Sequence, residues 1–134
     1  MKLLIIDGQG GQLGAQLIKA IQAQFPQVEI SAVGTNAAAT ASMLKAGAER
    51  AATGENAVRV ACRKADVIVG PIGIVITDAM LGEVTEQMAV AVGRADAVRI
   101  LIPVNKCENL IAGVQDFNMT AMIRDVLVKI EKML

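Results

Sequence analysis

A glycine-rich segment near the N-terminus, residues 8–14 (GQGGQLG), has the strongest potential for ligand chemistry. Glycine has no Cβ atom, so its backbone can turn sharply and approach a ligand closely. A helix that begins at such a loop directs free N–H groups and a positive dipole end toward one point, which favours phosphate. The segment follows an aliphatic run at residues 2–6 and precedes a helical pattern at 12–24, as a dinucleotide-binding loop does. We therefore predict a small phosphate-bearing ligand, a nucleotide or dinucleotide, at this loop.

The glycine spacing departs from the dinucleotide-binding pattern GxGxxG. Counted from Gly8, the third glycine position holds Leu13, and taking Gly14 as the third glycine makes the loop one residue longer. The acid that commonly binds ribose after the second strand is absent, because Gly34 is followed by Thr35 and Asn36. No cationic residue stands there for a 2′-phosphate. The cofactor is left open between NAD(P) and another nucleotide, and a glycine-rich turn without ligand is the competing interpretation.

The carboxyl ends of parallel strands meet at one sheet edge, so other loops are expected beside the glycine loop. This edge is rich in Gly, Asn and Thr, which suit close backbone contact and sugar recognition but also suit turns. The candidate cofactor-binding residues on it are Asp7, Gly8, Gln9, Gly10, Gly11, Gln12, Gly14, Gly34, Thr35, Asn36, Gly70, Pro71, Gly73 and Asn105. Taken alone, Asn36 is better explained as the cap of the following helix than as a ligand contact.

Potentially reactive side chains are few, and the chain has no histidine. Asp7 either touches a ligand or stabilises the turn, and Glu55 is interpreted as a helix-start acid paired with Thr53. Asp78 and Glu83 face either the crevice or solvent. The remaining candidates are a phosphate-neutralising lysine and a nucleophilic cysteine, Lys106 and Cys107. No catalytic constellation or metal-ligand pattern results, so catalytic residues are unknown and an enzymatic role is undecided.

Composition limits the classes of partner. The 134 residues are 54% hydrophobic and 19% charged, which favours a packed core. Basic and acidic residues balance at 13 each, and the aromatic residues are Phe25 and Phe117, so nucleic acid is not an expected partner. The longest apolar run, residues 67–76, is broken by glycine and proline and is too short for a membrane span. A reduced cytoplasmic protein is the simplest interpretation.

Apolar runs of strand length alternate with helical periodicity, which is typical of βαβ units. Strands are predicted at residues 2–6, 28–33, 66–69, 98–103 and 110–114, with a less regular one at 49–52. Helices are predicted at residues 12–24, 37–46, 55–65, 74–81, 85–93 and 117–134, with a loop at 70–73. The sequence thus predicts one three-layer Rossmann-like α/β domain over residues 1–134, with a mostly parallel sheet of five or six strands, helices on both faces and order 3-2-1-4-5-6.

Several blocks together resemble one family of short bacterial proteins of unknown function with a Rossmann-like domain. The blocks are IDGQGG (6–11), GTNA (34–37), MLKAGA (43–48), ATGENA (52–57), GPIGIV (70–75) and MLGE (80–83). The resemblance covers nearly the whole chain. It implies a small stand-alone domain and supplies no activity.

Three functions are therefore compared. The leading one is a nucleotide-binding protein, expected to be a homo-oligomer because an Ala-rich helix and a Met-bearing C-terminal helix offer surfaces for self-association. The second is an oxidoreductase-like enzyme whose site is completed by a neighbouring subunit, although dehydrogenases normally use a second domain to cover the substrate. The third is a regulatory or scaffold subunit without ligand.

Overall fold

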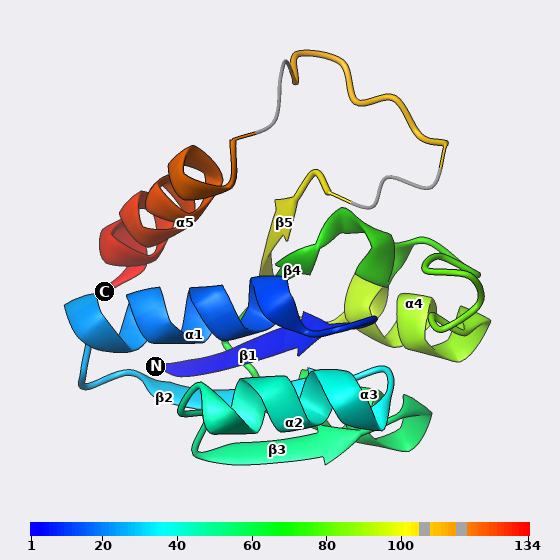
Figure 1. Cartoon of the computed structure of the whole chain (residues 1–134), viewed down its shortest axis with the longest axis horizontal. Coiled ribbons are helices and arrows are strands. Elements are labelled where there is room, and N and C mark those ends of the chain that lie inside the picture. Colours follow the sequence, from blue (N-terminus) through cyan, green and yellow to red (C-terminus); the bar gives the residue numbers. More distant parts are fainter. Residues whose placement is uncertain (105–107, 115–117) are drawn as a thin grey trace.

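A computed structural model gives the fold and describes residues 1–104, 108–114 and 118–134. Five parallel strands form one sheet in the order β3-β2-β1-β4-β5 (Figure 1). The strands are β1 (Lys2–Asp7), β2 (Glu29–Gly34), β3 (Arg50–Thr53), β4 (Val67–Pro71) and β5 (Val98–Ile102). The helices are α1 (Gln12–Gln24), α2 (Ala37–Lys45), α3 (Glu55–Cys62), the 3-10 helix η1 (Ile72–Val75), α4 (Glu86–Arg94) and α5 (Met119–Met133). The predicted three-layer α/β class is confirmed.

The central strand β1 is buried on both faces of the sheet. Leu3 and Ile5 point into a core shared with α1, α2 and α5, whereas Leu4 and Ile6 point into a core shared with α3 and α4. A strand covered on both sides needs apolar residues at every position rather than at alternate ones. This explains the continuous aliphatic run, and it holds the end of β1 at a defined place.

Helix α1 begins directly after the glycine loop and packs along β1. Its residues Leu17, Ile18 and Ile21 are fully buried, as the four-residue spacing predicts. Gly11 forms its N-cap with a φ of 73°. The helix therefore points its N-terminus at the carboxyl edge of the sheet, beside the end of β1.

The predicted strand at 110–114 is wrong, and the irregular one at 49–52 exists as β3. Residues 110–114 form turns and irregular structure, with Leu110 95% exposed. Gly113 has a φ of 85°, which extended strands do not use. The sheet therefore has five strands in the described residues, and β5 lies at its edge.

The segment between β4 and α4 also differs from prediction. Gly70 and Pro71 are the buried end of β4 rather than a loop. The predicted helix at 74–81 is replaced by η1 and a series of turns. Positive φ values at Asp78, Met80 and Leu81 are incompatible with a right-handed α-helix. Ile74, Ala79 and Met80 are buried beneath these turns, whereas Leu81 is fully exposed.

Substitution of the two adjacent loop glycines, Gly10 and Gly11, should change the stability of the protein by very different amounts. A Cβ at Gly11 would lie 2.7 Å from the Ala39 Cα of α2, and the φ of 73° disfavours any side chain. We expect Gly11→Ala to lower the free energy of unfolding by about 2–4 kcal/mol in urea denaturation. A Cβ at Gly10 would meet nothing nearer than 4.0 Å, so Gly10→Ala should cost less than about 0.5 kcal/mol. Equal losses in the two variants would contradict this account of the loop.

Candidate functional site

The side chain of Asp7 closes the glycine loop from inside. Asp7 ends β1 and is only 3% exposed. Its Oδ1 accepts a hydrogen bond from the Gly8 N–H, and its Oδ2 accepts one from the Gly14 N–H, both at 2.8 Å. Burial raises the pKa of the Asp7 carboxyl, helped by nearby Glu83 and opposed by these two N–H groups. The structure therefore gives Asp7 the role of stabilising the turn, joining the two ends of the loop.

A second carboxylate holds the outer side of the loop. Glu83 lies in the turns between η1 and α4. Its Oε1 accepts hydrogen bonds from the Gln9 N–H at 2.9 Å, the Thr35 hydroxyl at 2.7 Å and the Asn36 side-chain amide at 2.7 Å. Burial alone would raise the pKa of the Glu83 carboxyl, but the three hydrogen bonds outweigh it and the pKa lies below its ordinary value. Glu83 faces the crevice as an ionised group and connects the loop to the end of β2.

Asn36 links the same elements with its remaining polar atoms. Its Oδ1 accepts from the Ala39 N–H at 2.8 Å, so the predicted cap of α2 is confirmed. Its Nδ2 also donates to the Gln9 carbonyl at 2.9 Å. The loop, the end of β2, the start of α2 and the Glu83 turn therefore form one hydrogen-bonded unit.

Three N–H groups of the loop and the first turn of α1 have no partner among the residues that the structure describes. The Gly11 N–H donates to the Gly8 carbonyl at 2.9 Å, which completes the inner turn. In the described part of the chain, the N–H groups of Gly10, Gln12 and Leu13 donate to no acceptor. These groups are the donors that a helix N-terminus normally offers to water, a cap or an anion.

Close contacts with neighbouring residues explain why most positions of the loop hold glycine. A Cβ at Gly8 would lie 2.5 Å from the Met80 Sδ, and a Cβ at Gly14 would lie 2.5 Å from the Met43 Sδ. Together with Gly11, these positions need glycine whether or not a ligand binds. Gly10 alone among the four faces open space, and it therefore separates a packing requirement from a binding requirement.

The other predicted site residues are only partly brought to this place. Gly70, Pro71 and Gly73 are buried in β4 and η1 and present no open loop. Gly34 ends β2 and packs against the start of α2. Asn105 lies outside the described residues.

The reactive candidates are similarly dispersed. Glu55 accepts a hydrogen bond from Thr85 at 2.7 Å, joining the starts of α3 and α4, rather than pairing with Thr53 as predicted. Asp78 is exposed. Lys106 and Cys107 lie outside the described residues. The missed feature is the set of contacts to Glu83, for which the only signal was an acid interrupting an apolar stretch.

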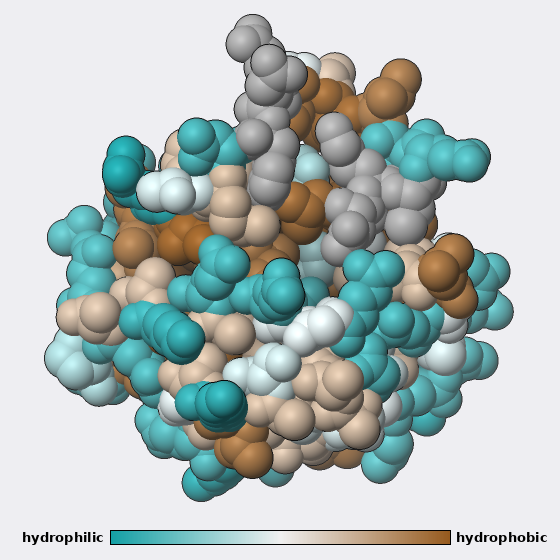
Figure 2. Space-filling model, viewed as in Figure 1, coloured by the Kyte–Doolittle hydropathy of each residue, from teal (hydrophilic) through white to brown (hydrophobic). Residues whose placement is uncertain are grey.

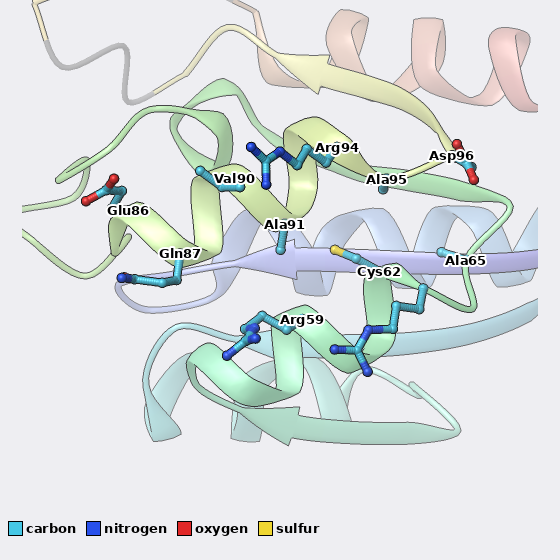
Figure 3. A pocket seen from close by; sticks show the side chains of 11 residues that line it. Arg59, Cys62, Ala65, Glu86, Gln87, Val90, Ala91, Arg94, Ala95 and Asp96 are labelled. Carbon is cyan, nitrogen blue, oxygen red and sulfur yellow. The ribbon is translucent and has the colours of Figure 1, made fainter.

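A surface groove with a volume of about 790 Å³ lies elsewhere, between α3 and α4 (Figure 3). Both signs of charge line it, including Arg59 and Arg94 against Glu86 and Asp96. Burial raises the pKa of the Cys62 thiol at its base to about 11, so this thiol is neutral and a poor nucleophile near pH 7. None of the lining residues belongs to the glycine loop.

The described residues hold neither a membrane-spanning helix nor a cluster of metal ligands. No helix among them is long and apolar enough to cross a membrane. Within the same residues, no group of three or more His, Cys, Asp or Glu side chains is arranged to hold a metal ion.

The chain belongs to the family described as "Domain of unknown function (DUF3842)", whose model matches residues 2–134. No curated protein is similar enough in sequence to count as a match. A dodecameric FMN-dependent UbiX-like decarboxylase from Escherichia coli O157:H7 has a similar crystal structure, with a TM-score of 0.50 and 17% sequence identity. The alignment covers 99% of this chain and 76% of the decarboxylase chain. At this identity the likeness shows the fold alone.

The Glu83 contacts predict a pH-dependent stability difference between the wild type and Glu83→Gln. Because the folded pKa of Glu83 lies below 4.5, its charge contributes stability above that pH, and the contribution is lost as pH falls through the folded pKa. Urea unfolding should show the wild type to be more stable at about pH 7, with the difference shrinking toward about pH 3. A difference that stays constant over this range would contradict the role assigned to the carboxylate.

Proposed function

We propose that this family member binds a nucleotide or dinucleotide at the carboxyl edge of its sheet. The phosphate would accept hydrogen bonds from the N–H groups of Gly10, Gln12 and Leu13. The observation that carries the proposal is that these three donors are unpartnered in the described residues, beside the one loop glycine that faces open space. A 13-residue helix behind them adds its positive dipole end.

Charge determines where along the loop the phosphate would lie. Glu83 already occupies the Gln9 side of the loop with a carboxylate. A second anion there would be repelled, whereas the start of α1 carries no acid in its first turn. The phosphate is therefore assigned to the α1 side, and the rest of the nucleotide to the side of Thr35, Asn36 and Glu83.

The proposed ligand is a class of compounds rather than one cofactor. NAD(P), FMN and simple nucleoside monophosphates all present a phosphate next to a hydroxylated carbon chain or ring. FMN is included because the structurally similar decarboxylase is described as FMN-dependent. The absence of an acid after β2 argued against an ordinary NAD site. Because Glu83 lies next to Thr35 and Asn36, a carboxylate is nevertheless present at that place, and NAD stays among the candidate ligands.

We also propose that the protein is a homo-oligomer. Figure 2 shows hydrophobic surface gathered between α5 and α1, while hydrophilic residues spread over the lower part of the same face. Val98 of the edge strand is 54% exposed, and so is Leu134 at the end of the chain. The similar decarboxylase is described as a dodecamer. A neighbouring copy on this side would cover apolar surface, and the enzyme alternative needs such a copy to complete a substrate site.

The binding proposal is tested by thermal shift with NAD, NADP, FMN and AMP. A ligand at about a hundred times its Kd should stabilise the wild type by about 2.7 kcal/mol, which raises the melting temperature by several degrees. Gly10→Val should fold normally and lose the shift, because its side chain fills the space before the free N–H groups.

The matched control is Gly93→Val. A Cβ at Gly93 on α4 also meets nothing within 4 Å, and the position lies outside the loop, so this variant should keep the full shift. If none of the four nucleotides raises the melting temperature at millimolar concentration, a scaffold function without ligand is favoured instead. A full shift in Gly10→Val would move the ligand away from the loop.

A further inference from the structure

We infer that Glu83 binds the ribose hydroxyls of the ligand, supplying from a distant turn the acid that this fold commonly places after the second strand. The inference rests on the proposed nucleotide-binding function and adds the class of sugar that the site selects. It follows from where the carboxylate lies, which of its oxygens is free and how firmly its turn is held.

The carboxylate lies at the ribose position of the fold. Thr35 and Asn36 follow directly after β2, and both donate to the Glu83 Oε1 at 2.7 Å. In dinucleotide-binding sheets, an acid at this point accepts hydrogen bonds from the ribose hydroxyls. No acid stands at the carboxyl end of β2, and Glu83 reaches this place from a position 47 residues beyond Asn36.

One carboxylate oxygen is free to bind. Oε1 is occupied by its three donors, whereas Oε2 accepts no hydrogen bond from the described residues. No buried side-chain oxygen or nitrogen in those residues lacks a partner, so Oε2 must be accessible to solvent. An ionised oxygen with open lone pairs beside the phosphate donors suits two neighbouring hydroxyl groups.

The turn that carries Glu83 is held in a strained conformation. Asp78, Met80 and Leu81 all have left-handed φ values between 57° and 66°. The Asp78 N–H donates to the Val84 carbonyl at 2.8 Å, and Met80 is buried against the loop at Gly8. Left-handed non-glycine residues persist only where surrounding contacts enforce them, and they cluster at binding sites. The turn therefore presents Glu83 in one defined position.

The geometry commits the site to a ribonucleotide with free 2′ and 3′ hydroxyls. A 2′-deoxy sugar leaves Oε2 without one hydrogen bond, and a 2′-phosphate places a second anion against the carboxylate. NAD should therefore bind in preference to NADP, and each ribonucleotide in preference to its deoxy counterpart.

The test is calorimetric titration of the wild type with NAD, NADP and the 5′-monophosphates of adenosine, guanosine, cytidine and uridine, each monophosphate beside its 2′-deoxy form. For every ribonucleotide that binds, loss of the 2′-hydroxyl should raise the Kd by about tenfold or more. NADP should bind at least about tenfold more weakly than NAD.

Glu83→Gln tests whether the charge of the carboxylate causes the preference for NAD over NADP. Its amide oxygen keeps an acceptor for the three donors but loses the charge, so the preference for NAD over NADP should fall toward one. Glu86→Gln removes the same charge three residues further along, on the side of the α3–α4 groove, and should leave the preference unchanged.

The outcomes separate the two proposals. Equal affinity for ribose and deoxyribose forms in the wild type overturns the Glu83 inference and leaves nucleotide binding intact. Absence of binding by every titrated probe overturns the Glu83 inference. If FMN also gives no thermal shift, nucleotide binding is overturned as well. Tighter and non-selective binding by Glu83→Gln also overturns the inference, because the carboxylate would then be competing with the phosphate. If Glu83→Gln fails to fold, the inference is tested by the wild type alone, through its affinities for each ribonucleotide and its 2′-deoxy form and for NAD and NADP.

Discussion

Two carboxylates bind different N–H groups of one glycine loop and together fix its shape. Asp7 takes the N–H groups of Gly8 and Gly14 from inside, and Glu83 takes that of Gln9 from outside. Carboxylates pair backbone N–H groups more strongly than neutral acceptors do. What is left over, the donors at Gly10 and the first turn of α1, is the part of the loop available to a ligand.

The layers of the fold make this arrangement rigid. Since β1 is covered on both faces, Asp7 cannot move without disturbing both cores, and α1 is held against α2 by the close approach of Gly11 to Ala39. The Glu83 turn is anchored separately through Met80. Elements from three separate parts of the chain thus meet at one edge, where doubly wound sheets carry their ligands.

The sequence predicted features that arise from local pattern. The aliphatic run of β1, the spacing in α1 and the cap at Asn36 depend on near neighbours, and the structure agrees with them. The helix predicted at 74–81 does not form, because Asp78, Met80 and Leu81 adopt left-handed backbone conformations. The contacts of Glu83 were not predictable, because a strained turn brings it to residues 47 and more positions away. The glycine pattern in the sequence also does not show which glycines are required for packing and which leave room for a ligand. Only the surroundings of each glycine in the structure distinguish the two.

The most direct test of the central claim is an amide NMR titration with AMP or NAD. The account predicts that the largest chemical-shift changes occur at the N–H groups of Gly10, Gln12 and Leu13. The amides of Gly8 and Gly14, which remain bound to Asp7, should change much less. Changes concentrated in the α3–α4 groove, with the loop amides unaffected, would contradict it.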